Sequence, residues 1–307
     1  MTELEDTTTL RVPRARGQRP VEVPLQPNQL AGRYRIDDEI GRGGMSVVYR
    51  GTDLQTGATR AIKVGLLSSL DDARPPERLA AEATILMFLR HPNLVAVHDM
   101  GTDATHGLHF AVMDYAPGGS LGDRVKAHGP LAPAEVASVG VQLCCVLSML
   151  HERDILHRDV KPTNLLLDAD GHMLLADLGI SKIPEAMGDA TRDDLVMGSF
   201  PYMAPEQVNG MDHTSKAGDL YAVGTTLFRL ATDASTVNLF AVRDDAPRWQ
   251  ELPEVLRPAI RHASQLYPEQ RPTSAWALGA QLAPLAPPEL FVQQPHLAEW
   301  LEEGAAS

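Results

Sequence analysis

The periodicity of apolar residues changes at Pro117-Gly118-Gly119, and this change constrains the fold more than any other feature of the chain. Before it, apolar residues alternate with polar ones in short runs between turn residues, a pattern typical of β-strands. After it, they recur at helical spacing or form apolar runs that suit buried helices. The sequence therefore predicts an α+β protein, with a small antiparallel β-sheet lobe followed by a larger, mostly helical lobe.

Individual elements follow from the same pattern. Strands are predicted over 34–41, 46–52, 59–66, 94–102 and 108–114. Helices are predicted over 76–90, 132–151, 218–230, 254–264 and 274–282. Residues 1–33 contain few large apolar groups, so we expect a flexible N-terminal extension there. Repeated prolines predict a Pro-rich, acidic C-terminal tail over 284–307, with one short helix over 296–303.

Composition narrows the function classes. The 307 residues include 27 Lys and Arg against 40 Asp and Glu, which gives a net charge of −13. Neither nucleic acid nor an anionic membrane surface is therefore an expected partner. Cys144 and Cys145 are adjacent, so they form no disulfide framework and lack zinc-ligand spacing, which fits a reducing, cytoplasmic location. The apolar run 136–150 is shorter than the ~20 residues of a membrane span, so we expect a buried helix, no membrane span and no secretory signal.

Three glycines in the segment 40–44 follow a predicted strand, where they free backbone N–H groups to approach a phosphate. An ordinary hairpin turn has the same appearance, and this segment alone leaves that alternative open. The apolar run Val47-Val48-Tyr49 predicts a second strand after the glycines, whereas a Rossmann site needs a helix there. No P-loop sequence occurs in the chain.

Two charged residues lie in apolar patterns. Lys63 belongs to the predicted strand 59–66, and Glu82 lies on the apolar stripe of the predicted helix 76–90. A buried carboxylate needs a partner, and an ion pair with Lys63 would hold the ammonium group toward phosphates under the glycine segment. Taken alone, a lysine in such a strand is usually solvated, and that alternative stays open for Lys63.

A proline-containing loop over 157–164 brings together an acid, a cation and an amide. Asp159 with Asn164 suits general-base positioning and metal binding, and Lys161 could neutralise a transferring phosphoryl group. Asp177 follows the apolar run 173–176 at a predicted strand end, a position typical of a metal ligand. Asp159 or Asp177 taken singly could be a loop cap. The presence of both, together with Lys63 and Glu82, favours a catalytic site.

The order of these segments resembles the catalytic domain of eukaryotic-type (Hanks-type) protein kinases, specifically the bacterial serine/threonine branch. The glycine-rich hairpin, Ala61-Ile62-Lys63, the helical Glu82, the 157–164 loop, Asp177-Leu178-Gly179 and Ala204-Pro205-Glu206 occur in that order over about residues 34–283. The resemblance implies the bilobal protein kinase fold. Its N-lobe and hinge would cover 34–116, with one regulatory helix, and its C-lobe would cover 117–283.

The resemblance implies a non-specific serine/threonine protein kinase that uses ATP with Mg²⁺, or Mn²⁺ in its place, on protein substrates. Asp159 would accept the proton of the substrate hydroxyl, and Lys161 would steady the γ-phosphate. Lys63 would contact the α and β phosphates and pair with Glu82. The implied cofactor-binding residues are Ile40, Gly41, Gly43, Ser46, Val48, Ala61, Lys63, Met113, Asp114, Ala116 and Leu166. The implied metal ligands are Asn164 and Asp177.

Regulatory residues are implied by the same resemblance. Arg158 would pair with a phosphorylated residue of the segment that follows Asp177, and Thr191 is the leading autophosphorylation site. Ser199 stands where a threonine usually contacts the catalytic acid. The acidic run 5–9 with its threonines resembles a phosphothreonine tag for a forkhead-associated domain, against the alternative of a plain solvated tail. A nucleotide-binding pseudokinase or scaffold and a small-molecule kinase are the competing functions.

Overall fold

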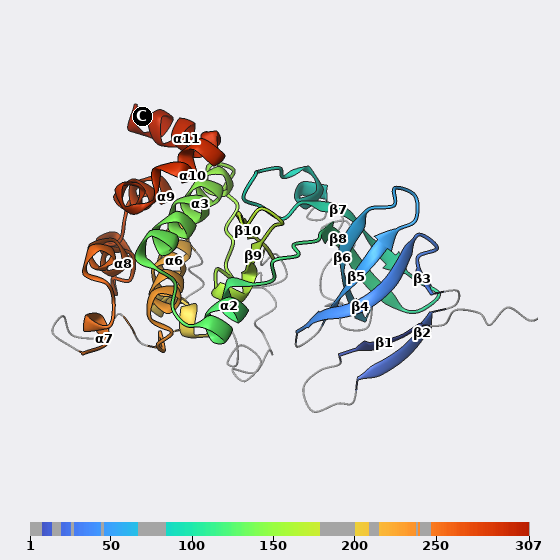
Figure 1. Ribbon diagram of the computed structural model, residues 1–307. Coiled ribbons are helices and arrows are strands. Elements are labelled where there is room, and N and C mark those ends of the chain that lie inside the picture. The colour runs from blue at the N-terminus through green and yellow to red at the C-terminus, as the bar shows by residue number, and fades with distance from the viewer. Residues whose placement is uncertain are drawn as a thin grey trace, which may run out of the picture. The chain divides into compact units, whose positions relative to one another are not determined.

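The computed structural model describes residues 8–13, 20–25, 28–43, 46–66, 84–178, 200–208, 215–237, 239 and 247–306. The chain divides into two units (Figure 1). The N-terminal unit comprises Met1–His91 and Val95–Ala116, and the C-terminal unit comprises Pro92–Leu94 and Pro117–Ser307. Strands dominate the first unit and helices the second, so the predicted α+β class is confirmed.

The N-terminal unit is built on one antiparallel six-stranded sheet. Its strand order is β3-β4-β5-β6-β8-β7. The strands are β3 (Gln29–Leu30), β4 (Tyr34–Arg42), β5 (Ser46–Asp53), β6 (Thr59–Leu66), β7 (Val97–Asp103) and β8 (Leu108–Asp114). Burial alternates along β5, as expected for a strand with one face in a core. All five predicted strands are confirmed to within a few residues at each end. Of the predicted helix 76–90, the structure describes 84–90, and 84–88 is helical.

A hairpin that the sequence did not predict precedes this sheet. Strands β1 (Thr8–Val12) and β2 (Val21–Leu25) pair antiparallel, with Leu10 opposite Val23. Leu10 and Leu25 are fully buried in one apolar cluster with sheet residues such as Ile62. The flexible extension predicted over 1–33 is therefore wrong for these strands. Large apolar residues are few there, but they alternate, so each strand presents a complete apolar face to the sheet.

The C-terminal unit is mainly helical. Its helices are α2 (Leu121–His128), α3 (Pro133–Glu152), α5 (Pro205–Val208), α6 (Lys216–Thr232), α7 (Pro247–Gln250), α8 (Arg257–Ala263), α9 (Ala275–Leu282), α10 (Pro288–Gln293) and α11 (Pro295–Ala305). A two-stranded sheet pairs β9 (Leu165–Leu167) with β10 (Met173–Leu175). The helices predicted over 132–151, 218–230 and 274–282 are confirmed as α3, α6 and α9, and 254–264 forms a 3₁₀ turn followed by α8.

Helix α3 is the central helix of this unit and contacts α6, α9 and α11. By length and composition it could cross a membrane, but 67% of its apolar window is buried inside the protein, as in the core helix of a folded domain. The polar residue Gln142 of α3 connects this helix to other segments of the unit. The Gln142 Oε1 accepts hydrogen bonds from the Met173 N–H (3.0 Å), the Asn93 Nδ2 (3.1 Å) and the Gln294 Nε2 (3.0 Å). A buried amide thus satisfies groups from three other segments.

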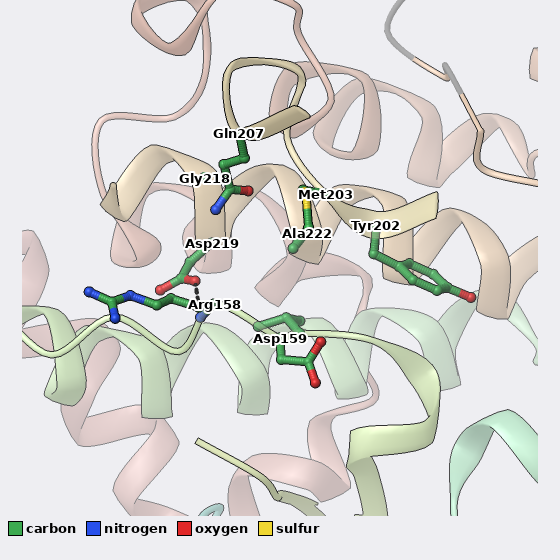
Figure 2. Close-up of a pocket in the computed structure, with 9 residues that line it drawn as sticks. Arg158, Asp159, Tyr202, Met203, Gln207, Gly218, Asp219 and Ala222 are labelled. Atoms are coloured by element: carbon green, nitrogen blue, oxygen red, sulfur yellow. Dashed lines mark hydrogen bonds between the residues drawn. The ribbon is translucent and has the colours of Figure 1, made fainter. Parts of the chain in front are cut away.

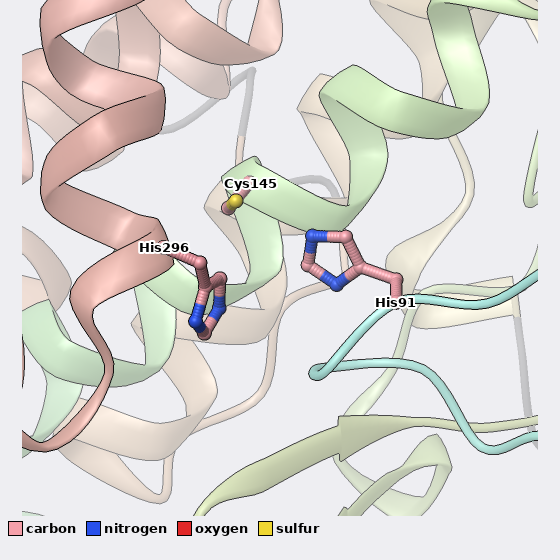
Figure 3. A group of neighbouring side chains, drawn as sticks. All are labelled: His91, Cys145 and His296. Atoms are coloured by element: carbon pink, nitrogen blue, oxygen red, sulfur yellow. The ribbon is translucent and has the colours of Figure 1, made fainter.

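The predicted tail 284–307 is also folded. Helices α10 and α11 join the C-terminal unit, with Leu297 fully buried and the Trp276 Nε1 donating to the Leu301 carbonyl at 3.2 Å. Figure 3 shows His296 on the first turn of α11 and Cys145 on α3. The His296 Nε2 lies 2.9 Å from the Asn93 Oδ1. Both α10 and α11 begin with proline, a residue that suits the first turn of a helix and does not break it there.

Candidate functional site

The loop 155–161 follows α3 and is held by the carboxylate of Asp219 on the first turn of α6. The Asp219 Oδ2 accepts from the His157 N–H (2.9 Å) and the His151 Nε2 (2.8 Å), and Oδ1 accepts from the Arg158 N–H (2.8 Å). Asp219 is 3% exposed. Its Ser215 N-cap fixes the start of α6, since the Ser215 Oγ accepts from the Gly218 N–H at 3.1 Å. One buried acid therefore sets the backbone of the predicted catalytic loop.

His157 links this loop to the segment that carries Asp177. Its Nε2 donates to the Ala176 carbonyl at 3.1 Å, and its Nδ1 accepts from the Asp159 N–H at 3.3 Å. Burial lowers the pKa of His157, which favours the neutral ring. The two contacts require that same neutral form, with its proton on Nε2. His157 thus connects the backbones beside the two predicted acids.

Asp159, Lys161 and Asn164 converge within hydrogen-bond distance. The Asp159 Oδ2 accepts from the Lys161 Nζ at 2.9 Å and from the Asn164 Nδ2 at 3.1 Å. The Asn164 Nδ2 also donates to the Asp159 carbonyl at 2.8 Å. The sequence placed these residues in one loop, and the structure brings their side chains together. A carboxylate beside an ammonium group and an amide can orient a hydroxyl group and accept its proton.

Asp177 is held in the same neighbourhood by its preceding residue. The Ala176 N–H donates to the Asn164 carbonyl at 2.8 Å. The Asn164 amide nitrogen faces Asp159, so its oxygen is the atom suited to a cation. An amide oxygen with carboxylates is a donor set for Mg²⁺ or Mn²⁺, so these residues fit the metal that the sequence implied.

Backbone strain marks the same two segments. Arg158 has φ +65° and Asp177 has φ +57°, both in the left-handed region that few residues other than glycine adopt. Such conformations cost about 1–3 kcal/mol each and persist where the surroundings determine them, often at functional sites. Here the Arg158 N–H donates a hydrogen bond to Asp219. Asp177 follows Ala176, whose carbonyl and N–H both form hydrogen bonds.

A pocket lies beside this loop within the C-terminal unit (Figure 2). Its lining includes Arg158, Asp159, Tyr202, Met203 and Asp219. The Arg158 Nε is buried and has no hydrogen-bond partner among the described residues. Because an unsatisfied buried donor is costly, this guanidinium is suited to an anionic group from a segment outside them.

Glu206 and Arg271 form a buried ion pair in this unit. The Arg271 Nη1 and Nη2 donate to the two Glu206 carboxylate oxygens at 2.7 and 2.8 Å, with the Arg271 side chain 0% exposed. Carbonyls of Ala217, Gln265 and Leu266 accept the remaining guanidinium hydrogens. The bidentate pair anchors the start of α5 to α6 and to the loop before α9.

In the N-terminal unit, strand register places the predicted nucleotide-contacting residues on one face of the sheet. Val48 lies opposite Lys63, and Ala61 lies opposite Met113, so all four side chains point to the same side. The alternate residues of β6, such as Ile62, face the apolar cluster on the other side. The remaining predicted residues of this unit are Ile40 and Gly41 on β4, Gly43 after it, Ser46 on β5, Asp114 on β8 and Ala116 beyond it.

Contacts give some of these residues a defined local role. The Gly43 N–H donates to the Ser46 carbonyl at 2.8 Å, which closes the glycine-rich hairpin. The Asp114 carboxylate is bound by the Arg60 Nη1 at 3.0 Å, and the Asp114 N–H donates to the Ala96 carbonyl at 3.0 Å. Leu166 lies on β9 of the C-terminal unit and is bridged to Ser120. Glu82, Thr191 and Ser199 lie outside the described residues.

The sequence did not predict the close packing of His109 against Gly65. On β8 it lies opposite Gly65, and a side chain at Gly65 would approach the His109 Nε2 to 2.3 Å. Burial lowers the pKa of His109, and the charge of Lys63 lowers it further. The glycine at position 65 was the signal, because a glycine inside a strand marks close approach by another group.

Comparison with known proteins gives a consistent result. Residues 34–282 match the family model for the protein kinase domain. The serine/threonine-protein kinase PrkC of Bacillus subtilis is 35% identical over 204 residues, 66% of this chain and 31% of that protein. The serine/threonine-protein kinase PknB of Mycobacterium tuberculosis is 34% identical over 212 residues, 67% of this chain and 33% of that protein. The chain thus spans about a third of the length of these curated relatives.

Among solved structures, the crystal structure of Rad53 residues 1–466 in complex with AMP-PNP aligns with a TM-score of 0.67. The two chains are 21% identical, and the alignment covers 83% of this chain and 65% of Rad53. At this identity the likeness shows the fold alone, and it agrees with the fold expected from the sequence.

Proposed function

Because the chain belongs to the protein kinase family, we propose that it is a serine/threonine protein kinase that transfers the γ-phosphate of ATP to protein hydroxyl groups in bacterial signalling. The observation that carries this proposal is the convergence of Asp159, Lys161 and Asn164 on one strained, Asp219-braced loop. Lys161, two residues after the acid, follows the serine/threonine pattern of the family.

The proposed transfer is an in-line displacement at the γ-phosphorus. The substrate hydroxyl oxygen forms the new P–O bond, its proton passes to the Asp159 carboxylate, and the bond to the bridging oxygen of ADP breaks. Lys161 balances charge on the transferring group and, through its 2.9 Å contact, fixes the Asp159 oxygen that it touches. Asn164 donates to the same oxygen, Asp159 Oδ2, at 3.1 Å.

The remaining predicted site residues would bind nucleotide and metal. Asn164 and Asp177 would bind Mg²⁺, or Mn²⁺ in its place, which supplies positive charge to the phosphates. Lys63 would bind the α and β phosphates and pair with Glu82. Val48 and Ala61 would cover the adenine, together with the other predicted contacts Ile40, Gly41, Gly43, Ser46, Met113, Asp114, Ala116 and Leu166.

A nucleotide-binding pseudokinase or scaffold is the alternative function. It is disfavoured because Lys63, Glu82, Asp159, Asn164 and Asp177 are all present, whereas scaffolds of this kind typically lack at least one of them. The strained Asp177 backbone also favours catalysis, since strain is maintained where geometry is used. The two functions share nucleotide binding and differ in transfer.

The test is Asp159→Asn, which keeps the shape and removes the base. We expect phosphate transfer from labelled ATP, to the protein itself or to a basic protein, to fall by at least about a hundredfold. Nucleotide binding, measured by calorimetry, should persist. Asp170→Asn is the matched control, since Asp170 is exposed in the β9–β10 turn, and it should leave transfer unchanged. Undiminished transfer by Asp159→Asn would refute the assignment.

We propose further that autophosphorylation at Thr191 regulates the kinase and that Arg158 binds the phosphate. The support is the buried Nε of Arg158, which has no hydrogen-bond partner within the described part of the chain and which a phosphate oxygen would satisfy. Ser199 would contact Asp159 as a substrate-selecting hydroxyl. Mass spectrometry after incubation with ATP should find phosphate on Thr191, and Thr191→Ala should remove it. Absence of phosphate from residues 177–206 of the active protein would contradict the proposal.

Partners and location complete the proposal. We propose protein substrates, a cytoplasmic location consistent with two buried free cysteines, and a forkhead-associated domain that reads a phosphothreonine near the N-terminus. Thr9 is exposed on β1, and Thr8 is half-buried opposite Leu25. Binding of such a domain to a phosphorylated 1–20 peptide but not to its unphosphorylated form would test the last point. Equal binding to both would reject it.

A further inference from the structure

The β1–β2 hairpin is bonded to the sheet through the main chain of Arg11. The Arg11 N–H donates to the Tyr49 Oη on β5 at 3.1 Å. The Arg11 carbonyl accepts from the Arg42 Nη1 at 2.8 Å. The Arg11 side chain is not used in either bond, since it is 69% exposed and faces Glu22 at 3.3 Å. Both bonds therefore belong to the backbone of β1.

Arg42 lies between Gly41 and Gly43 at the end of β4, at the start of the glycine-rich turn. Its guanidinium is bound on a second side by Glu39, with the Arg42 Nε donating to the Glu39 Oε1 at 2.8 Å. Glycines on either side give the backbone a wide conformational choice. The contact to Arg11 is therefore a restraint from outside the β4–β5 hairpin, in addition to the pairing of Arg42 with Val47 and the bond from the Gly43 N–H to the Ser46 carbonyl.

The hairpin is itself firmly placed, so it can act as an anchor. Leu10 and Val12 flank Arg11 and are both fully buried in the apolar cluster of the sheet. Tyr49 is also buried, and burial raises the pKa of its hydroxyl, so this group stays protonated and accepts the Arg11 bond as a neutral phenol. The Arg11 backbone cannot move without moving its buried neighbours.

We propose that the β1–β2 hairpin is a positioning element for nucleotide binding and that Arg42 is the residue that ties the glycine-rich turn to it. The inference rests on the proposed kinase function and adds a determinant that lies outside the kinase-domain match, which begins at residue 34. With the tie present, the turn loses less conformational freedom when the nucleotide binds, so affinity is higher.

The central test compares steady-state kinetics of Arg42→Ala with those of the full-length wild-type chain. We expect the KM for ATP to rise about three- to tenfold, the equivalent of one lost hydrogen bond, while kcat at saturating ATP stays within about twofold. Arg11→Ala is the matched control, because it removes an arginine from the same contact but keeps the carbonyl that Arg42 binds. It should leave both constants unchanged. An unchanged KM in Arg42→Ala, or an equal rise in Arg11→Ala, overturns the proposal.

A double-mutant cycle separates the tie from direct contact between Arg42 and the nucleotide. Tyr49→Phe removes the second bond to Arg11 while keeping the ring in the core. If Arg42 acts through the hairpin, the KM increase of the double variant will be smaller than the product of the two single increases. A full product means that Arg42 acts on the nucleotide independently of β1, and it refutes the proposed tie.

A measurement without catalysis keeps this inference distinct from the proposed function. Hydrogen exchange of the amides over 40–43 and 46–49 in the nucleotide-free protein should be faster in Arg42→Ala than in the wild type or Arg11→Ala. Calorimetry with AMP-PNP should show weaker binding by the same factor as the KM change. If the wild type transfers no phosphate, the proposed function fails, while unchanged exchange and AMP-PNP affinity would specifically refute the tie.

Discussion

Asp219→Ala should destabilise the C-terminal unit more than any surface substitution, because Asp219 satisfies two buried backbone donors. Its carboxylate accepts from the His157 and Arg158 N–H groups at 2.9 and 2.8 Å, and from the His151 ring at 2.8 Å. An alanine leaves both backbone groups without this acceptor. At about 1–3 kcal/mol for each unsatisfied donor, the free energy of unfolding should fall by about 2–6 kcal/mol.

Asp219→Asn should produce a smaller loss of unfolding free energy for the same reason. The asparagine oxygen can still accept a hydrogen bond from one of the two backbone N–H groups. The asparagine NH₂ group faces the other backbone N–H, which therefore has lost its acceptor. We therefore expect a loss of about 1–3 kcal/mol for the second donor, roughly half of the alanine value. The His157–Arg158 backbone should relax in both variants, so phosphate transfer should fall together with stability.

Urea unfolding followed by tryptophan fluorescence is the assay, because Trp249, Trp276 and Trp300 all belong to the C-terminal unit. Lys216→Ala is the control, since Lys216 lies on the same turn of α6 but forms an exposed ion pair with Asp154. Its unfolding midpoint should not change measurably. An Asp219→Ala midpoint equal to that of the control would show that Asp219 does not support the loop as reasoned here.

Three further predictions follow from buried groups. Arg271→Ala leaves Glu206 without its bidentate partner and should cost about 3–5 kcal/mol in the tryptophan-detected unfolding of the C-terminal unit; a loss below about 1 kcal/mol would contradict this. Leu10→Ala should cost the N-terminal unit about 2–5 kcal/mol, measured by circular dichroism, whereas a truly flexible extension would tolerate it. Burial lowers the pKa of His157 below its ordinary 6.5, so the unfolded chain binds this proton at a higher pH than the folded protein: the contribution of His157 to stability should be constant above pH 6.5 and fall as the pH drops from there to the folded pKa. NMR titration of the His157 ring, showing a pKa at or above 6.5, would disprove that reasoning.

The elements predicted best are those whose signal lies in local periodicity. Burial alternates with partial exposure along β5 and most of β8, and α3 and α6 carry long apolar runs, so their types could be assigned from sequence. The clustering of Asp159, Lys161 and Asn164 was also predictable, because all three belong to one short loop. Local spacing was sufficient in each of these cases.

The features that were missed depend on partners distant in sequence or on the position of proline. The simultaneous bonds of Asp219 to His151, His157 and Arg158 follow only from the packing of α6 beside the loop, which local spacing does not reveal. In the C-terminal segment, repeated prolines predicted a tail with one short helix, yet Pro288 and Pro295 each occupy the first position of a helix. The same residue ends a helix or starts one, and its neighbours decide which.

The β1–β2 hairpin covers an apolar face of the six-stranded sheet that would otherwise be exposed to water. One face of β6 carries Ala61 and Lys63, which the proposed nucleotide site uses, while Ile62, Val64 and Leu66 point to the other side. Three large apolar residues on a single strand cannot remain in water without a large loss of hydrophobic stabilisation, so a sheet with this pattern requires a cover. No helix predicted from the sequence was assigned to that face. The alternation in β1 and β2 supplies the missing apolar surface, and the cover then lies within hydrogen-bond reach of Arg42. The β1–β2 hairpin buries one face of the sheet. Its position also allows it to influence the glycine-rich turn, which belongs to the proposed nucleotide site on the other face.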